Sequence, residues 1–212
     1  MSTVLRLVLA GALAVAFSTA GTSAHFKLLE PASWIAEDQR GDPQKVGPCG
    51  GDPKGANEKL LSGVVTKVTG GTKLHLKVQE TIYHPGHYRV ALAVNSRTEL
   101  PADPYSAEQW TEKGLYSTWG QIQSPPQLPV LADGLFPHYV RPAAGSPQAV
   151  FEADIALPNI SCARCTLQVL QYMANHVYNS PGGYSYHHCA DLQIVADPGK
   201  PIDAAWQRAA GK

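Results

Sequence analysis

The chain has 212 residues, and its 17 lysine and arginine side chains are balanced by 17 aspartate and glutamate side chains. This balance creates no strong field toward nucleic acid or an anionic membrane, so we expect neither as a partner. Only 16% of the residues are charged, whereas 19 are glycine and 17 are proline. Such a composition predicts many turns and few long helices.

The segment 1–24 has the layout of a secretory signal peptide. Arg6 supplies a positive charge, the apolar run Leu7–Phe17 follows, and small residues fill most of 18–24. The apolar run is well short of the roughly 20 residues that a membrane-spanning helix needs. We therefore expect the protein to be secreted or periplasmic, and not to be held in a membrane after cleavage.

The cleavage point decides what the mature chain can do. Thr22 and Ala24 put small side chains at the third and first positions before a cut, which predicts a mature chain that begins at His25. A cut after Ala20 satisfies the same rule and would begin the chain at Gly21. Cleavage before His25 leaves enough residues for one domain with a core.

Strand patterns recur along the remaining chain, whereas helical periodicity is hard to find. Polar and apolar residues alternate in several runs, which are Gly63–Val68, Lys73–Glu80, Tyr88–Val94, Gln148–Ile155, Cys165–Met173 and His188–Val195. Short strands punctuated by glycine and proline favour an antiparallel β-sandwich. We expect one sandwich domain at 25–196, with a long ordered loop at 100–147 and a tail at 197–212 that ends in a short helix.

A chain that begins with histidine can hold a metal ion. The free α-amino nitrogen and the ring of His25 close a chelate on one ion, and an imidazole from a second histidine completes a T-shaped set of three nitrogens. Nitrogen ligands in a planar or tetragonal arrangement select Cu(II). The α-amine has a reference pKa of about 7.7 to 8.0, so copper can displace its proton near neutral pH. The sequence therefore predicts a copper site, provided that cleavage falls directly before His25.

Two histidines are candidates for the third nitrogen. His84 lies in the turn made by Pro85 and Gly86, just before a predicted strand, and His87 begins that strand. A turn residue at the end of a sheet can reach toward the N-terminus, which favours His84 and leaves His87 as the runner-up. Two surface histidines that cap a turn are the alternative without a metal.

Three features together make the chain similar to the lytic polysaccharide monooxygenases, the copper histidine-brace enzymes that cleave chitin and cellulose. They are His25 directly after a signal peptide, the turn His84–Gly86 before an apolar strand, and Tyr186 three positions before Cys189. The stretch Cys189–Asp191 also resembles the last core strand of fungal members. Overall, the chain is most similar to bacterial monooxygenase-like proteins.

The resemblance implies a fold, a set of site residues and an activity. It implies an immunoglobulin- or fibronectin-III-like sandwich with long loops, and copper at one end of the sheets, held by His25 and His84. Tyr186 would lie at the axial copper position, and Gln171 would position oxygen, although a solvent-facing strand glutamine is the alternative. The implied activity is oxidative cleavage of a polysaccharide surface, with electrons from an external donor. We expect the protein to act as a monomer.

The four cysteines predict two disulfides, because an even count in an oxidising compartment is typical of paired cysteines. Cys162 and Cys165 form a Cys-x-x-Cys pair, and no second pair completes a zinc site. A small structural disulfide is therefore favoured over a redox or metal-binding pair. Cys49 would then pair with Cys189 and tie an early loop to the strand beside the predicted copper site.

Further histidines keep two other functions open. His87, His187 and His188 could add ligands and close the metal site, as in an exported copper-binding or delivery protein. A non-catalytic chitin-binding module is the third possibility, favoured if no brace forms. The lone histidines interpreted as structural are His75, His138 and His176. The tryptophans that fit either core packing or stacking on sugar rings are Trp34, Trp110 and Trp119.

Overall fold

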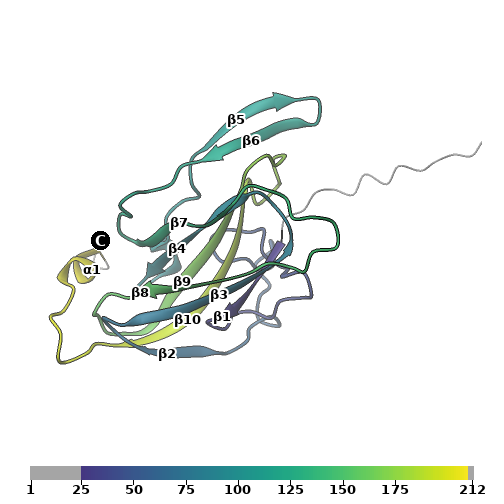
Figure 1. Cartoon of the computed structure of the whole chain (residues 1–212). Coiled ribbons are helices and arrows are strands. Elements are labelled where there is room, and N and C mark those ends of the chain that lie inside the picture. Colours follow the sequence, from purple (N-terminus) through teal and green to yellow (C-terminus); the bar gives the residue numbers. More distant parts are fainter. Residues whose placement is uncertain (1–24, 210–212) are drawn as a thin grey trace, which may run out of the picture.

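Two β-sheets pack face to face in the computed structural model, which describes residues 25–209 and their side chains as far as Trp206 (Figure 1). The smaller sheet has the order β1-β3-β8, with β1 at His25–Glu30, β3 at Lys73–Ile82 and β8 at Val150–Ala156. The larger sheet has the order β2-β10-β9-β4-β7. Its strands are β2 (Val65–Thr69), β10 (Ser185–Val195), β9 (Cys162–Met173), β4 (Gly86–Ala93) and β7 (Val130–His138). The fold is the expected all-β sandwich.

The strand pairs are antiparallel except at one edge, where β2 runs parallel to β10. The segment 100–147, expected to be a long ordered loop, contains strands of its own. It holds the hairpin of β5 (Ser106–Thr111) and β6 (Gly114–Gly120), which projects from the body of the molecule in Figure 1, and then β7. The alternation of polar and apolar residues is weak there because most side chains of β5 are exposed, so pattern reading missed these strands.

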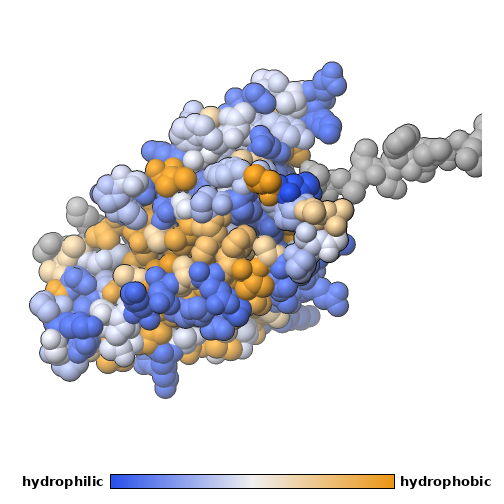
Figure 2. All heavy atoms as spheres, in the orientation of Figure 1, coloured by the Kyte–Doolittle hydropathy of each residue, from blue (hydrophilic) through white to orange (hydrophobic). Residues whose placement is uncertain are grey.

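The core lies between the two sheets and comes from the alternation that the sequence shows. On β3 the side chains of Leu74, Leu76 and Val78 are buried while their neighbours are partly or fully exposed. They meet the inward residues of the larger sheet, which include Tyr88, Val90, Leu92, Leu167, Val169, Ala190 and Leu192. The inward positions along β1 are Phe26 and Leu28. Figure 2 shows apolar residues gathered across the middle of the face in view, surrounded by hydrophilic ones.

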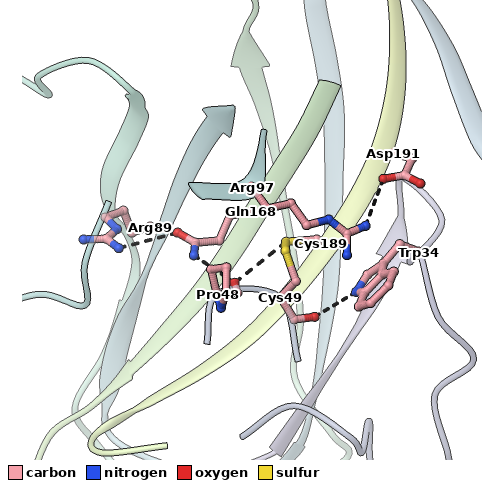
Figure 3. The surroundings of a disulfide bond; sticks show 8 residues. All are labelled: Trp34, Pro48, Cys49, Arg89, Arg97, Gln168, Cys189 and Asp191. Atoms are coloured by element: carbon pink, nitrogen blue, oxygen red, sulfur yellow. Dashed lines mark hydrogen bonds and ion pairs between the residues drawn. A yellow bond between two sulfur atoms is a disulfide. The ribbon is translucent and has the colours of Figure 1, made fainter. Parts of the chain in front are cut away.

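The outer face of the larger sheet is covered by the loop 31–62 and by the β5–β6 hairpin. A disulfide between Cys49 and Cys189 joins this loop to β10, and the indole nitrogen of Trp34 donates to the Cys49 carbonyl oxygen at 2.8 Å (Figure 3). The second disulfide joins Cys162 and Cys165 at the start of β9. Both expected pairings are confirmed, and Trp34 is a buried residue. Formed disulfides fit an oxidising environment.

The C-terminal tail ends in α1, at Ala204–Ala209, as the sequence indicated. Trp206 is buried in the main core, so the described part of the tail packs on the sandwich. The side-chain amide of Asn159 donates to the carbonyl oxygens of Asp197, Lys200 and Pro201, which holds the tail in place. Within 25–209, no helix is long and apolar enough to cross a membrane. The expected signal peptide at 1–24 lies outside the described residues.

Candidate functional site

One end of the sandwich interior is polar rather than apolar. The alternation on β3 continues past Val78 to Glu80, which is buried on the core side although it carries a carboxylate. On the opposite sheet Tyr186 pairs with Gln171, and Gln171 pairs with Tyr88, so these three side chains share the inner face. All three are fully buried. The predicted site residues Tyr186 and Gln171 therefore lie side by side, and Gln171 does not face solvent.

His25 opens β1 at this same end. Its ring lies edge-on to the ring of Tyr186, with centroids 5.3 Å apart. Its Nε2 lies 3.0 Å from a carboxylate oxygen of Asp42, and this hydrogen bond is the main reason that the pKa of Asp42 is lowered. Its Nδ1 is buried and has no hydrogen-bond partner. An ionised Asp42 holds the proton on Nε2 and leaves the Nδ1 lone pair free, as outer-shell carboxylates do for metal-binding histidines.

Asp42 is placed by a tight loop against β1. One side-chain oxygen of Asp38 accepts the backbone N–H groups of Arg40, Gly41 and Asp42. Gly41 has φ +100°, and a Cβ there would lie only 1.9 Å from the carbonyl oxygen of Phe26. No other residue fits this approach, so the glycine lets the loop reach the first strand. Asp42 was not predicted as a site residue, because nothing in the local sequence shows that its loop returns to His25.

His84 lies two residues beyond Ile82, which is the β3 residue that pairs with His25. Two strand residues span roughly 7 Å, so both predicted ligands are at the same end of the same sheet. The turn is tight, because a Cβ at Gly86 would lie 1.9 Å from the carbonyl oxygen of Tyr172. The ring of His84 is 4.5 Å from the ring of His176, and its Nδ1 is buried without a partner. Burial, and then the neighbouring His176, lower the pKa of His84 to about 3, so its ring is neutral.

Glu80 connects the residues around this site. A single oxygen, Oε1, accepts from the His84 backbone N–H at 2.9 Å, from His138 Nε2 at 3.1 Å and from Gln171 Nε2 at 3.2 Å. Burial opposes a charge on His138, but hydrogen bonds to Glu80 and to the Phe136 carbonyl oxygen outweigh it, so the pKa of His138 is raised. Glu80, on β3 of the smaller sheet, thus connects the turn that carries His84 with His138 and Gln171 of the larger sheet. Its inward position was readable from the alternation Leu74, Leu76, Val78, Glu80, whereas its partners were not.

Replacing Glu80 with alanine should destabilise the fold by about 3 kcal/mol or more, because three donors lose one acceptor and each unsatisfied buried group costs about 1–3 kcal/mol. Urea unfolding measures the change. Glu152→Ala is the matched control, since it removes a half-exposed carboxylate that pairs with Lys77 on the neighbouring strand. We expect this control to lose far less stability, because an exposed ion pair is screened by solvent. If both variants lost the same free energy of unfolding, the connecting role of Glu80 would be contradicted.

The runner-up ligand, His87, points to the other side of the larger sheet. It pairs with Tyr172 and stacks on that ring at 5.2 Å, and its Nδ1 lies 3.3 Å from the Tyr139 hydroxyl. Tyr172 belongs to the outer cluster, whereas Tyr88, next to His87 in the chain, belongs to the main core. The sheet therefore separates the His87 ring from Tyr186 and Gln171. This geometry favours His84 over His87 as the partner of His25.

The doublet His187–His188 divides between the two faces, as strand alternation requires. His187 points outward, where its Nε2 lies 2.8 Å from a carboxylate oxygen of Asp103. His188 points inward, where its Nε2 donates to the Phe26 carbonyl oxygen at 3.0 Å and its Nδ1 lies 3.1 Å from Glu37 Oε1. Each ring therefore has polar contacts of its own, although His188 lies near enough to His25 and Asp42 to interact with them electrostatically.

The side chains of Glu37 and His188 are both buried, and burial disfavours the charged form of each. Burial raises the pKa of Glu37 to about 7 and lowers the pKa of His188 to about 4. Because Nε2–H donates to a carbonyl oxygen, Nδ1 carries the lone pair and can accept only from a protonated carboxyl group. Glu37 Oε1 lies close to this nitrogen without the geometry of a hydrogen bond, and Glu37 accepts the Leu28 backbone N–H, so its carboxyl group is held between β1 and β10.

The Glu37→Gln variant should reveal a pH dependence that the wild-type pair conceals. The raised pKa of Glu37 contributes stability that is present below 4.5 and lost as the pH rises toward about 7. The lowered pKa of His188 contributes stability that is present above 6.5 and lost as the pH falls toward about 4. The two slopes oppose each other in the wild type. In Glu37→Gln the unfolding free energy should fall by up to about 1.4 kcal/mol per pH unit on acidification, relative to wild type. If the unfolding free energies of the two proteins followed the same pH dependence across this range, the raised pKa of Glu37 would be contradicted.

His138 and His176 were interpreted as structural, and the structure brings both beside the predicted site. His138 contacts Glu80 and His176 contacts His84. Both come from segments far from His25 in the chain, and no motif in the sequence connects them to it. His75 is half-exposed on β3 and lies near Glu152 and Asp154. Trp110 and Trp119 are exposed on the β5–β6 hairpin, so the core-packing alternative is wrong for these two.

Comparison with models of known protein families finds no match, and comparison with curated protein sequences finds none either. Within residues 25–209, no three side chains of histidine, cysteine, aspartate or glutamate gather as a metal site. A brace is a different donor set, because it takes two imidazoles and one α-amine. Whether His25 and His84 can form a brace therefore depends on the contacts of these two residues.

Proposed function

We propose that the mature protein begins at His25, holds a copper ion with the α-amine and ring of His25 and the ring of His84, and cleaves a polysaccharide oxidatively after secretion. The observation that carries the proposal is the state of the His25 ring. Its Nε2 is held by Asp42 while its buried Nδ1 has no partner. An orphaned buried nitrogen costs free energy unless something binds it, and an α-amine on the same residue would complete a chelate there.

The donor set suits copper in chemistry and in charge state. The neutral ring of His84 also carries an unpartnered buried nitrogen, and both rings come from one end of one sheet. Neutral imidazole and amine nitrogens are ligands that favour Cu(II). The carboxylates that contact the rings and turns, Asp42 and Glu80, act from a second layer and orient the donors.

A bound copper ion would supply the redox chemistry, cycling between Cu(II) and Cu(I) with electrons from an external donor and activating oxygen or peroxide for attack on a glycosidic carbon. The chain's own residues orient the site and limit access to it. The Tyr186 ring lies against His25, and its hydroxyl accepts from the side-chain amide of Asn179 at 3.1 Å. Gln171 donates to Glu80 and leaves its own Oε1 without a partner, as a buried acceptor beside Tyr186.

The test uses protein processed to start at His25 and loaded with one equivalent of Cu(II). Electron paramagnetic resonance should give an axial spectrum with coupling to three nitrogens, and mass spectrometry should find oxidised chain ends after incubation with chitin or cellulose and a reductant. The matched control carries one extra glycine before His25, which removes the chelating α-amine and leaves the fold unchanged. Equal copper affinity in both proteins would contradict the brace. Coupling to a fourth nitrogen, supplied by a third imidazole, without oxidised products would instead support the copper carrier.

A further inference from the structure

A groove of about 530 Å³ lies outside the predicted copper site, between β5 and the segment 178–185. Its size falls within the roughly 300–1,000 Å³ that is usual for ligand sites. Tyr184, which lines it, packs against Leu170 and Tyr172, so the groove is on the outer side of the larger sheet. One wall of the groove is formed by Tyr105, directly before β5, and by Ser106 and Glu108 of β5.

Two tyrosine rings face this groove and are held in place although they are exposed. Tyr105 is 68% exposed, and Trp119 lies edge-on to it with ring centroids 6.3 Å apart. Tyr178 is 54% exposed, and Tyr184 lies edge-on to it at 5.5 Å. A ring that is already ordered loses little conformational entropy when a ligand stacks on it. Two such rings in one groove therefore form a prepared stacking surface.

The charged groups in the lining of the groove are carboxylates. Asp103 and Glu108 are both in its lining, and the described lining contains no lysine or arginine. Asp103 accepts from His187 and also interacts with the side chain of Ser185, which holds its carboxylate in place at the groove. Tyr184 is only 7% exposed, and its hydroxyl lies close to the Glu108 carboxylate. Burial and the nearby Glu108 raise the pKa of Tyr184, so this hydroxyl keeps its proton.

We propose that this groove binds an amino-sugar unit of a polysaccharide chain, with Tyr105 and Tyr178 stacking on the sugar ring and Asp103 and Glu108 facing its ammonium and hydroxyl groups. Sugar rings present an apolar C–H face and a polar edge, which match an aromatic wall beside carboxylates. The negative lining selects a cationic sugar over a uronic acid. The inference rests on the proposed function for the kind of polymer bound. The groove adjoins the proposed copper site, because Asn179, next to Tyr178 in the chain, donates to the Tyr186 hydroxyl.

The binding test needs no metal. Chitosan oligosaccharides are titrated into the mature, copper-free protein at mildly acidic pH, and binding is followed by calorimetry and by NMR shifts. Tyr178→Ala and Tyr105→Ala should each weaken binding about tenfold, the effect of losing one stacking contact. Glu108→Gln should reduce the preference for chitosan over cello-oligosaccharides. Both tyrosines are largely exposed, so thermal melting of the variants should match wild type.

Trp110→Ala is the matched control, because Trp110 is 81% exposed on the same hairpin but does not line the groove. The proposal is overturned if this control loses as much affinity as Tyr178→Ala, or if both tyrosine variants bind like wild type. Tighter binding of oligogalacturonate or cello-oligosaccharide than of chitosan would overturn the choice of an amino sugar. Groove binding without copper binding would leave this inference standing and remove the proposed enzyme. If oxidised products form but the tyrosine variants bind chitosan like wild type, the proposed enzyme stands and this inference is overturned.

Discussion

His84→Ala is expected to weaken Cu(II) binding by roughly a hundredfold or more, because loss of an outer-shell partner alone costs about 10–100-fold in metal affinity. In the proposed brace His84 supplies one of three equatorial nitrogens, and its ring is neutral and buried with an unpartnered nitrogen. Asp42→Ala should have the smaller effect, about 10–100-fold, since it only orients the His25 ring. Isothermal calorimetry with Cu(II) ranks the variants directly.

Two histidine variants serve as controls for that series. His87→Ala should leave the copper affinity nearly intact, because the His87 ring stacks on Tyr172 across the sheet from Tyr186. His75→Ala removes a half-exposed ring from the same strand as Glu80 and should have no effect. Tyr186→Phe should also retain the metal, since the nitrogens carry the binding. If His87→Ala abolishes binding and His84→Ala does not, the ligand assignment is reversed.

Removal of the Cys49–Cys189 disulfide by a double alanine substitution should lower the unfolding free energy by about 5 kcal/mol, the chain-entropy value for its sequence separation of 140. The bridge joins the loop 31–62 to β10, and this loop also carries Asp42 and the buried Gln44 that accepts the Phe26 backbone N–H. We therefore expect copper affinity to fall together with stability. Urea unfolding and copper calorimetry on the same preparation measure both effects.

The second disulfide is the internal control for the first. Cys162 and Cys165 are three residues apart, so the same entropy relation assigns their bridge only about 1.5 kcal/mol. Both double variants remove two cysteines and one covalent bond, and they differ mainly in the length of chain enclosed. If the two variants lost the same free energy of unfolding, the larger stabilisation expected from the Cys49–Cys189 bridge would be contradicted.

The sequence predicted the elements whose signal is local. Alternation of polar and apolar residues located six of the sandwich strands, and in the structure Tyr88 and Val90 of one of them lie in the core. Strand alternation also required His187 and His188 to point to opposite faces, which the structure confirms. The even cysteine count indicated two bridges, and the short Cys-x-x-Cys spacing left one partner for Cys49. The hairpin β5–β6 was missed, because exposed strands lack the apolar face on which pattern reading depends.

What only the tertiary structure decided is which distant residues meet at the end of the sandwich. The sequence could nominate His25 and His84 as a pair, and it placed Tyr186 through a family resemblance. It could not show that Asp42 returns to the His25 ring, or that His138 and Gln171 share one oxygen of Glu80. Those contacts depend on loop closure and on the pairing of strands far apart in the chain, and neither leaves a periodic trace in the residues. A local pattern sets which way a side chain points, whereas the packing of the two sheets sets what it touches.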